Sequence, residues 1–351
     1  MLIFGASYGS LFAAKLLLAG HDVQLVCLPA EASLINREGI RVALPVKGSD
    51  EIRSLDSGRL LGRPSARPPG EVNPTDFDLV VLAMQEPQYR FDDVRALLAS
   101  VAAHELPCIS IMNMPPPPFL DRIPGIDAES CGPCYADPSV WSALDPQLIT
   151  HCSADPQASR AAGGPLNSID VRLPSNFKCG RFENEAHNAM LHGLAASIDS
   201  SSLTGGPDRI ELPVKLRVHE SIFVPLAKWP MLIAGNYRCV TMDGIRSIES
   251  AVHSDIEASR SVYEWVRELC RTLGASAEDL VSFEKYAAAA HFLKGPSSAA
   301  RALASGAAHI ERVDKLVQLL ALQRRMESPV LNEIVERVDQ ELSRNRREVS
   351  A

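Results

Sequence analysis

Residues 1–27 decide the fold of this chain, and they read MLIFGASYGSLFAAKLLLAGHDVQLVC. The pattern predicts an apolar strand over 2–4, a glycine turn over 5–9, an apolar-periodic helix over 11–19 and a second strand over 23–27. A helix N-terminus carries unpaired N–H groups and a partial positive charge, so this βαβ unit predicts a pyrophosphate pocket and hence a dinucleotide site. The candidate contacts in the turn are Gly5, Ser7, Tyr8, Gly9 and Ser10.

The glycine turn departs from the usual dinucleotide fingerprint. That fingerprint is G-x-G-x-x-G, whereas this chain has GASYGS over 5–10, with two glycines and one residue fewer between the outer pair. The alternative is a turn of small residues kept only for packing, but the position at the chain start and the strand that follows favour a cofactor. The end of the second strand has no acid placed for a ribose 2′-hydroxyl and no arginine placed for a 2′-phosphate. Glu31 and Arg37 are misplaced stand-ins that stay open as alternatives, and we interpret them as solvated charges. The choice between NAD and NADP therefore stays open.

Length and charge narrow the class of protein. The 351 residues suit two domains. A net charge of −8 and a pI near 5.6 disfavour nucleic acid and anionic membranes as partners. The apolar N-terminus has no basic region before it and is interrupted by Lys15, unlike a signal peptide. We therefore expect a cytoplasmic enzyme that acts on a small molecule, and a homodimer remains an open alternative.

The eight cysteines are scattered, and one pair has the spacing of a functional motif. Cys131 and Cys134 form a C-x-x-C sequence, which occurs in redox dithiols and zinc sites. Asp127, Glu129 and Asp137 lie close in sequence and disfavour a reactive thiolate. A zinc site completed by His151 and Cys152 is an alternative, but we predict an inert loop and no bound metal.

The rest of the chain changes character near residue 216. Before it, apolar runs over 78–84 and 107–112 predict buried parallel strands, while 47–74 is predicted to be irregular and the topology of 121–210 stays open. After it, helical periodicity dominates. The predicted helical ranges are 216–239, 245–273, 278–292, 297–321 and 328–345. We therefore predict an α/β Rossmann-type N-terminal domain over 1–215, followed by an all-α C-terminal domain over 216–351.

The helical half contains polar residues suited to reduction of a carbonyl. Hydride transfer to a carbonyl carbon leaves an alkoxide, which a positioned acid must protonate. Lys228 and Asn236 are spaced to lie near one face of a helix, about 12 Å apart along its axis. Ser298 and Glu311 are further candidates, although each of the four residues alone fits an ordinary surface position.

Taken in order, these motifs resemble the ketopantoate reductase family. The order comprises the glycine turn, the strand ending at Asn113, the helix with Lys228 and Asn236, and the segment from Ser298 to Glu311. The resemblance implies a Rossmann domain and an all-helical domain with the active site between them. It further implies Lys228 as the general acid and Glu311 as its partner. It also implies cofactor contacts at Met84, Gln85 and Asn113, and substrate contacts at Asn113, Asn236 and Ser298.

Several positions differ from the family pattern. Leu232 stands where the family has an asparagine, Met114 replaces a glycine, and Leu28 replaces an arginine. A polar ligand replaced by leucine predicts a more apolar or differently oriented substrate. We therefore expect NAD(P)H-dependent reduction of a small 2-oxo acid or related carbonyl, with ketopantoate itself disfavoured. An opine-type imine reductase and a catalytically silent nucleotide-binding regulator are the alternatives.

Overall fold

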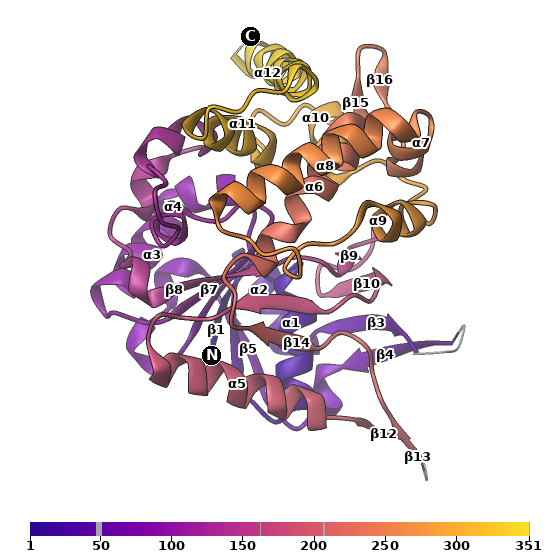
Figure 1. Cartoon of the computed structure of the whole chain (residues 1–351). Helices are drawn as coiled ribbons and strands as arrows, with labels where there is room; N and C mark the ends of the chain where they lie inside the picture. Colours follow the sequence, from indigo (N-terminus) through magenta and orange to yellow (C-terminus); the bar gives the residue numbers. More distant parts are fainter. Residues whose placement is uncertain (47–50, 162, 206–207, 351) are drawn as a thin grey trace. The chain divides into compact units, whose positions relative to one another are not determined.

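The chain folds into two compact units in a computed structural model that describes residues 1–46, 51–161, 163–205 and 208–350 (Figure 1). Unit 1 comprises 1–84, 88–112 and 140–222. Unit 2 comprises 85–87, 113–139 and 223–351. The sequence analysis expects a single boundary between residues 215 and 216. The structure instead places 216–222 in the first unit, and it places 85–87 and 113–139 in the second.

Unit 1 is built on an eight-stranded sheet in the order β14-β11-β8-β7-β6-β1-β2-β5. Its strands are β1 (Leu2–Phe4), β2 (Val23–Val26), β5 (Pro64–Arg67), β6 (Val80–Leu82), β7 (Cys108–Met112), β8 (Ile149–Ser153), β11 (Phe177–Gly180) and β14 (Leu216–His219). All neighbours run parallel except β8 and β11. The central strands are buried throughout, as expected for a parallel sheet covered on both faces.

The predicted βαβ unit at the chain start is confirmed. Strands β1 and β2 pair in parallel, with Phe4 opposite Val26, and helix α1 (Gly9–Leu18) connects them. Every residue of α1 is buried, because the helix lies inside the core of unit 1. The other α-helices in the described part of this unit are α2 (Pro29–Glu38), α3 (Asp92–Ala103) and α5 (Glu185–Ser200).

Residues 47–74 are more regular than the sequence predicts. Strand β5 extends the main sheet beside β2, and β4 (Ile52–Asp56) pairs antiparallel with β3 (Arg41–Pro45). A second sheet has the order β4-β3-β10-β9, with β9 (Gln157–Ser159) and β10 (Ser168–Leu173). Proline and glycine in 47–74 indicated loops, yet β4 pairs with the strand just before it, and β5 pairs with β2, which is distant in the chain. Residues 47–50 lie outside the described residues.

A further small hairpin joins β12 (Leu203–Gly205) and β13 (Asp208–Ile210).

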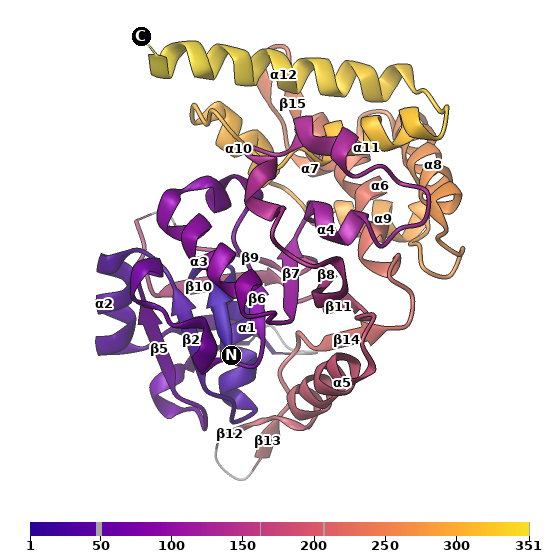
Figure 2. The same cartoon turned by 90° about the vertical axis from the view of Figure 1, so that its left-hand side faces the viewer.

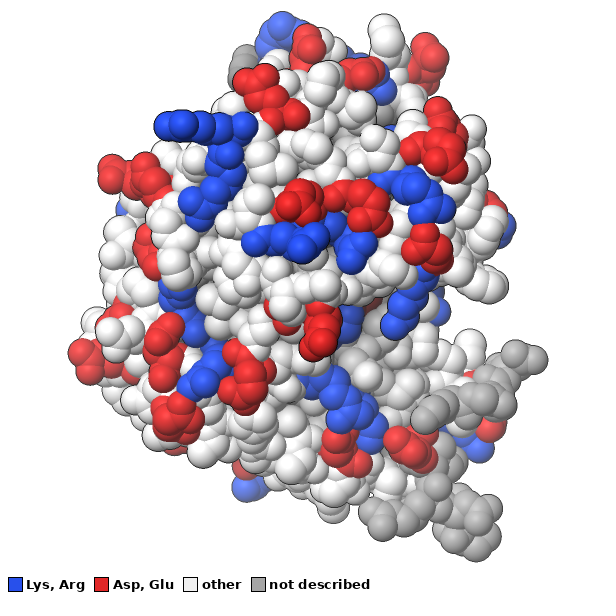
Figure 3. Space-filling model, in the orientation of Figure 1, with Lys and Arg blue, Asp and Glu red and all other residues white. Residues whose placement is uncertain are grey.

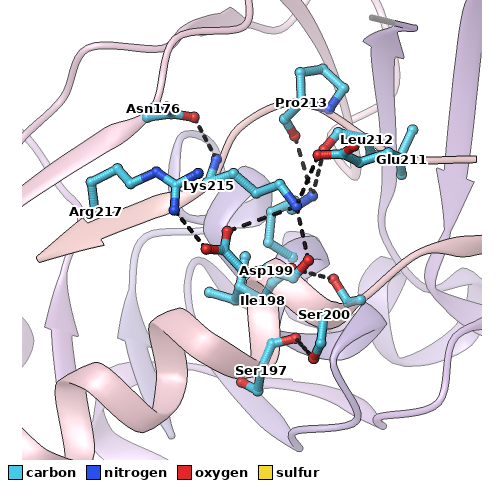
Figure 4. Close-up of polar contacts among 12 residues, drawn as sticks. Asn176, Ser197, Ile198, Asp199, Ser200, Glu211, Leu212, Pro213, Lys215 and Arg217 are labelled. Carbon is cyan, nitrogen blue, oxygen red and sulfur yellow. Dashed lines mark hydrogen bonds and ion pairs between the residues drawn. The ribbon is translucent and has the colours of Figure 1, made fainter.

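The buried Lys215 fixes the chain before β14 (Figure 4). Lys215 is 7% exposed, and its Nζ donates to the carbonyl of Asp199 at the end of α5 at 3.1 Å. The Asp199 carboxylate also pairs with Arg217 at 2.6 Å. A cation at a helix C-terminus is favourable because the last carbonyls carry partial negative charge. These contacts and the pairing of β14 with β11 explain why the helix predicted from residue 216 is wrong over 216–219.

Unit 2 is mainly helical (Figure 2). Its α-helices are α4 (Pro117–Leu120), α6 (Trp229–Met231), α7 (Ile248–His253), α8 (Ile256–Leu273), α9 (Phe283–Ala290), α10 (Ser298–Ala304), α11 (Val313–Gln323) and α12 (Pro329–Ser350). A two-stranded hairpin of β15 (Val240–Thr241) and β16 (Gly244–Ile245) modifies the all-α prediction. Arg312 links α11 to α12, because it pairs with Asp314 at 2.9 Å and Asp339 at 2.6 Å.

Charges of both signs are interspersed on the face shown in Figure 3, without a broad area of one sign. The described helices include none with both the length and the apolar character that crossing a membrane requires.

Candidate functional site

The centre of the candidate site is the Glu311 carboxylate in unit 2. Glu311 is 7% exposed, and its Oε2 accepts a hydrogen bond from Asn113 Nδ2 at 2.8 Å. The backbone N–H groups of Glu86 and Asn113 also donate to this carboxylate, and the Lys228 ammonium acts on it electrostatically. Burial raises the pKa of Glu311, while the donors and Lys228 oppose that rise. The structure thus brings together Lys228, Glu311 and Asn113, which are far apart in sequence.

Lys228 lies at a break between two short helices. It ends the 3₁₀ helix Val224–Lys228 and precedes α6, whose second residue is Pro230. A proline in the first turn of a helix sacrifices no intrahelical hydrogen bond, so the chain can start a new helix here. Lys228 is half-buried, whereas its neighbours Ala227 and Trp229 are buried. This setting differs from the solvated surface position that is usual for a lysine on a helix.

Tyr237 holds the backbone beside Glu311, and sequence reasoning missed it. Its hydroxyl donates to the carbonyl of Glu311 and accepts the N–H of Val313 at 2.9 Å. Both contacts are buried, and burial raises the pKa of this phenol well above its ordinary value. Tyr237 therefore stays neutral and fixes the chain that carries Glu311 at the start of α11. Its position directly after Asn236 was the only available signal.

Glu86 is a second residue that sequence reasoning did not select. It is 1% exposed, and both of its carboxylate oxygens accept the backbone N–H of Ala136 at 3.1 Å. Glu86 therefore acts twice, because its side chain holds the segment 85–87 while its own N–H donates to Glu311. A glutamate directly after an apolar strand was the sequence signal. Gln85, the predicted cofactor contact beside it, is exposed.

Asn236 lies in a π-helical turn, and Ser298 is the first residue of α10. The helix expected from Lys228 to Asn236 is interrupted by a π-helical turn over Leu232–Asn236. The carbonyl of Asn236 accepts the Ser297 hydroxyl at 2.7 Å, and that hydroxyl also caps α10. Ser298 is exposed, and Asn236 is half-buried. The structure therefore links the Asn236 backbone to the start of α10, while the predicted substrate contacts of both side chains stay predictions.

The glycine turn of unit 1 has the close packing that a nucleotide cradle needs. Gly5 has φ +99°, and a Cβ there would lie 3.0 Å from the Met84 side chain. A Cβ on Gly9 would lie 2.8 Å from Ile3. The two glycines therefore allow a left-handed turn and a close approach of α1 to β1, which are the roles of glycines in dinucleotide folds. The residues present fit a pyrophosphate group at the start of this ten-residue helix.

The side chains of Ser7, Tyr8 and Ser10 differ in their exposure and in their hydrogen bonds. Ser7 is exposed, whereas the buried Ser10 hydroxyl donates to the carbonyl of Ala6. The Tyr8 hydroxyl donates to the carbonyl of Pro156 at 2.8 Å, and its ring packs edge-on against Phe177. Burial raises the pKa of Tyr8 well above its ordinary value. The hydroxyls of Tyr8 and Ser10 are therefore engaged within the protein, and the Ser10 N–H also donates to the carbonyl of Ser7 at 3.1 Å.

The C-x-x-C sequence lies in a 3₁₀ helix, Glu129–Cys134, rather than the predicted loop, and of its residues only the two cysteines are buried. Both thiols are free, and burial raises the pKa of Cys131 to about 11 and that of Cys134 further. Burial is the larger cause, with Asp127 contributing at Cys131, so the acidic neighbours alone were an incomplete explanation. His151 Nδ1 lies 2.8 Å from the Ser110 hydroxyl. Among the described residues, no group of three His, Cys, Asp or Glu side chains is arranged to hold a metal ion.

Comparison with known proteins identifies the fold. No protein-family model and no curated protein matches the sequence. Solved structures do match over nearly the whole chain. A 2-dehydropantoate 2-reductase from Methylococcus capsulatus has a TM-score of 0.65 at 16% identity and covers 98% of this chain and 96% of its own. A dimeric ketopantoate reductase from Staphylococcus aureus has a TM-score of 0.64 at 11% identity, with 98% and 99% covered.

A D-mandelate dehydrogenase in complex with NADH and anilino(oxo)acetate is also similar. Its TM-score is 0.63 at 13% identity, with 99% of this chain and 100% of that chain covered. The class of fold is therefore an α/β Rossmann-type domain with a helical C-terminal region. More particularly, it is the fold of the ketopantoate reductases and of this mandelate dehydrogenase, as the resemblance in the sequence implied.

Proposed function

We propose that this protein is an NAD(P)H-dependent reductase of a small 2-oxo acid or a related carbonyl compound. The observation that carries the proposal is the buried Glu311 carboxylate, held by Asn113 and the N–H groups of 86 and 113 beside the Lys228 ammonium. Burial of a carboxylate is costly unless it is hydrogen-bonded and paired, so this cluster is built to keep a charge in place. The neighbours of the same fold reduce or oxidise compounds of this kind, as their names state.

A bound nicotinamide dinucleotide would supply the hydride in this reaction. The backbone of the turn over 5–10 would hold its pyrophosphate at the start of α1. Lys228 would donate a proton to the substrate oxygen as negative charge develops there. Glu311 would hold the ammonium group in position and accept a hydrogen bond from the substrate. Asn113, fixed by its bond to Glu311, would orient the groups that react.

The substrate that we propose has an apolar side chain. Leu232 is 2% exposed and replaces a polar residue of the ketopantoate reductases, so it removes a partner for a substrate hydroxyl. A buried polar group without a partner is unfavourable, which disfavours ketopantoate. The mandelate dehydrogenase neighbour is in complex with anilino(oxo)acetate, a 2-oxo acid derivative with an aromatic group. Asn236 and Ser298 are the proposed contacts for the polar part of the substrate.

The function is tested first by binding and then by turnover. Titration of the protein with NADH or NADPH, monitored by nicotinamide fluorescence, should show saturable binding. Gly9→Val should abolish that binding, because even a Cβ at this position would lie 2.8 Å from Ile3. The melting temperature of this variant must be measured alongside, since the substitution also crowds β1. No binding to the wild-type protein by either nucleotide would refute the proposal.

A substrate panel then separates the alternatives. Oxidation of NADH or NADPH with 2-oxo acids alone would support the proposed reaction. Turnover that requires an added amine would indicate an opine-type imine reductase instead. Nucleotide binding without turnover of any 2-oxo acid or imine would favour the third alternative, a catalytically silent regulator that binds the nucleotide.

A further inference from the structure

An ion pair lies where the sequence suggested only solvated charges. The Arg160 guanidinium contacts Oε1 of Glu31, and the two side chains are 25% and 10% exposed. Glu31 is in the first turn of α2, directly after β2, whereas Arg160 follows β9. Both residues belong to unit 1. The interpretation of Glu31 as a solvated charge is therefore wrong.

The position of this pair matters because of the sheet order. Strands β1 and β2 are parallel neighbours, so the glycine turn and the start of α2 follow the same edge of the sheet. In dinucleotide-binding folds, the residues after the second strand meet the adenosine ribose. There an acid accepts the 2′-hydroxyl of NAD, or an arginine takes the 2′-phosphate of NADP.

The segment that carries Arg160 is anchored beside the glycine turn. The carbonyl of Pro156 accepts the Tyr8 hydroxyl at 2.8 Å, four residues before Arg160. Strand β9 between them pairs with β10. One end of this short segment thus lies at the predicted pyrophosphate cradle, and its other end lies at Glu31. The charges on Glu31 and Arg160 are held in place by the fold.

The pair is incompletely satisfied. Among the described residues, Oε1 of Glu31 contacts the guanidinium, and no partner is found for Oε2. Arg160 Nε is buried without a partner in the same part of the chain. A carboxylate oxygen can accept from one or two hydroxyl groups, and such charge-assisted bonds are the stronger kind. Oε2 of Glu31 therefore has capacity to accept from the hydroxyl groups of a polar ligand.

We propose that Glu31 accepts the adenosine ribose hydroxyls of the cofactor and makes the protein select NADH over NADPH, with Arg160 as the residue that positions Glu31. This inference rests on the proposed function. A 2′-phosphate would have to lie against the Glu31 carboxylate, whose Oε1 already takes the Arg160 guanidinium through Nη2. Selectivity then comes from repulsion of the phosphate as well as from attraction of the hydroxyls.

Calorimetry on the wild-type protein tests this without turnover. NADH, NADPH, ADP-ribose and 2′-phospho-ADP-ribose are titrated separately. We expect each ligand without the 2′-phosphate to bind at least about tenfold more tightly than its phosphorylated counterpart, the effect of one charge-assisted hydrogen bond. Equal binding, or tighter binding of the phosphorylated ligands, would overturn the assignment while leaving the proposed reductase intact. Failure of all four to bind would instead overturn the proposed function, and this assignment with it.

Two variants locate the selectivity. Glu31→Gln should lower the ratio of NADPH Kd to NADH Kd by about tenfold, because the amide no longer repels a phosphate. Glu38→Gln is the matched control, since Glu38 lies on the same helix, is paired with Arg37 at 2.8 Å and should leave the ratio unchanged. An unchanged ratio in Glu31→Gln, at an unchanged melting temperature, would contradict the proposal.

Arg160→Met provides the opposite test and does not depend on Glu31→Gln folding. It leaves Glu31 without its countercharge, so NADPH should bind no better than to the wild-type protein. A ratio of NADPH Kd to NADH Kd that falls toward one in this variant would show that Glu31 does not repel the phosphate and would refute the assignment.

Discussion

Lys228 in unit 2 and Lys15 in unit 1 are both withdrawn from solvent, but they are withdrawn in different ways. Lys15 is 1% exposed within α1, and its Nζ donates to the carbonyl of Pro213 at 3.2 Å. Burial, and then the nearby Lys215 charge, lower the pKa of Lys15 to about 8. Lys228 is half-buried and acts on the carboxylate of Glu311.

The comparison shows that a perturbed lysine is not sufficient for catalysis. Lys15 has the lowered pKa that is often found in active sites. It is nevertheless enclosed on all sides by its own unit, so no substrate reaches it. Lys228 combines partial exposure with a carboxylate that three hydrogen bonds hold in place, from the Asn113 amide and the backbone N–H groups of Glu86 and Asn113. The following predictions test that distinction.

Removal of Lys228 should have the largest effect. Lys228→Ala should lower kcat by roughly 10²–10⁴-fold, the contribution of a positioned general acid. NADH affinity should stay nearly unchanged, because the predicted nucleotide cradle is formed by other residues. Steady-state kinetics on the best substrate and a nucleotide titration measure both quantities. A variant with near-normal kcat would remove the proposed mechanism.

Glu311→Gln should act in the same direction with a smaller loss, of about 10–100-fold in kcat, because Glu311 orients groups rather than supplying the proton. Because the pKa of Glu311 is raised, wild-type activity should fall on acidification at a pH above the ordinary glutamate value of 4.5. Protonation below that point removes the charge that holds Lys228. In the variant, the fall of kcat at low pH, the acid limb, should disappear from the pH profile. If the fall is unchanged, a group other than Glu311 causes it.

Glu86→Ala should lower kcat by roughly tenfold, since the segment that donates to Glu311 loses its hydrogen bonds to Ala136. Loss of the Glu86 N–H bond raises the pKa of Glu311 further, so the acid limb should move to higher pH. Glu86→Gln retains an oxygen for the Ala136 N–H and should restore most of the activity. A drop in melting temperature without a shift of the acid limb would indicate a purely structural role.

Lys15→Met should leave kcat nearly unchanged and alter stability instead. Below pH 8 both folded and unfolded chains carry the Lys15 proton. Between about 8 and 10.5 the unfolded chain binds more protons, so the free energy of unfolding rises with pH, by up to about 3 kcal/mol from this group. Lys215, Asp199 and Glu211 act on the same ammonium and are present in both proteins. Urea unfolding at several pH values in this range should show that the free energy of unfolding rises less steeply with pH in the variant than in the wild-type protein. Equal slopes in the two proteins would contradict the expectation.

The sequence predicted the elements whose signal is local. The apolar strands and the glycines of residues 1–27 gave the βαβ unit, because period and turn chemistry depend on near neighbours alone. It also indicated Lys228, Glu311 and Asn113 through their resemblance to a known order of motifs. It did not reveal β5 or β14, because each strand forms by pairing with a partner distant in the chain.

Residue types and local periodicity were therefore sufficient for the fold class, whereas the candidate catalytic residues came from the resemblance to a family's order of motifs. The partners of the buried charges were decided only by tertiary structure. Glu86 reaches Ala136, Tyr237 reaches Glu311, and Glu31 meets Arg160, and none of these pairs is encoded by spacing along the chain. A buried charge is stabilised by whichever donor or countercharge the fold places beside it, and that neighbour exists only after distant segments have packed together.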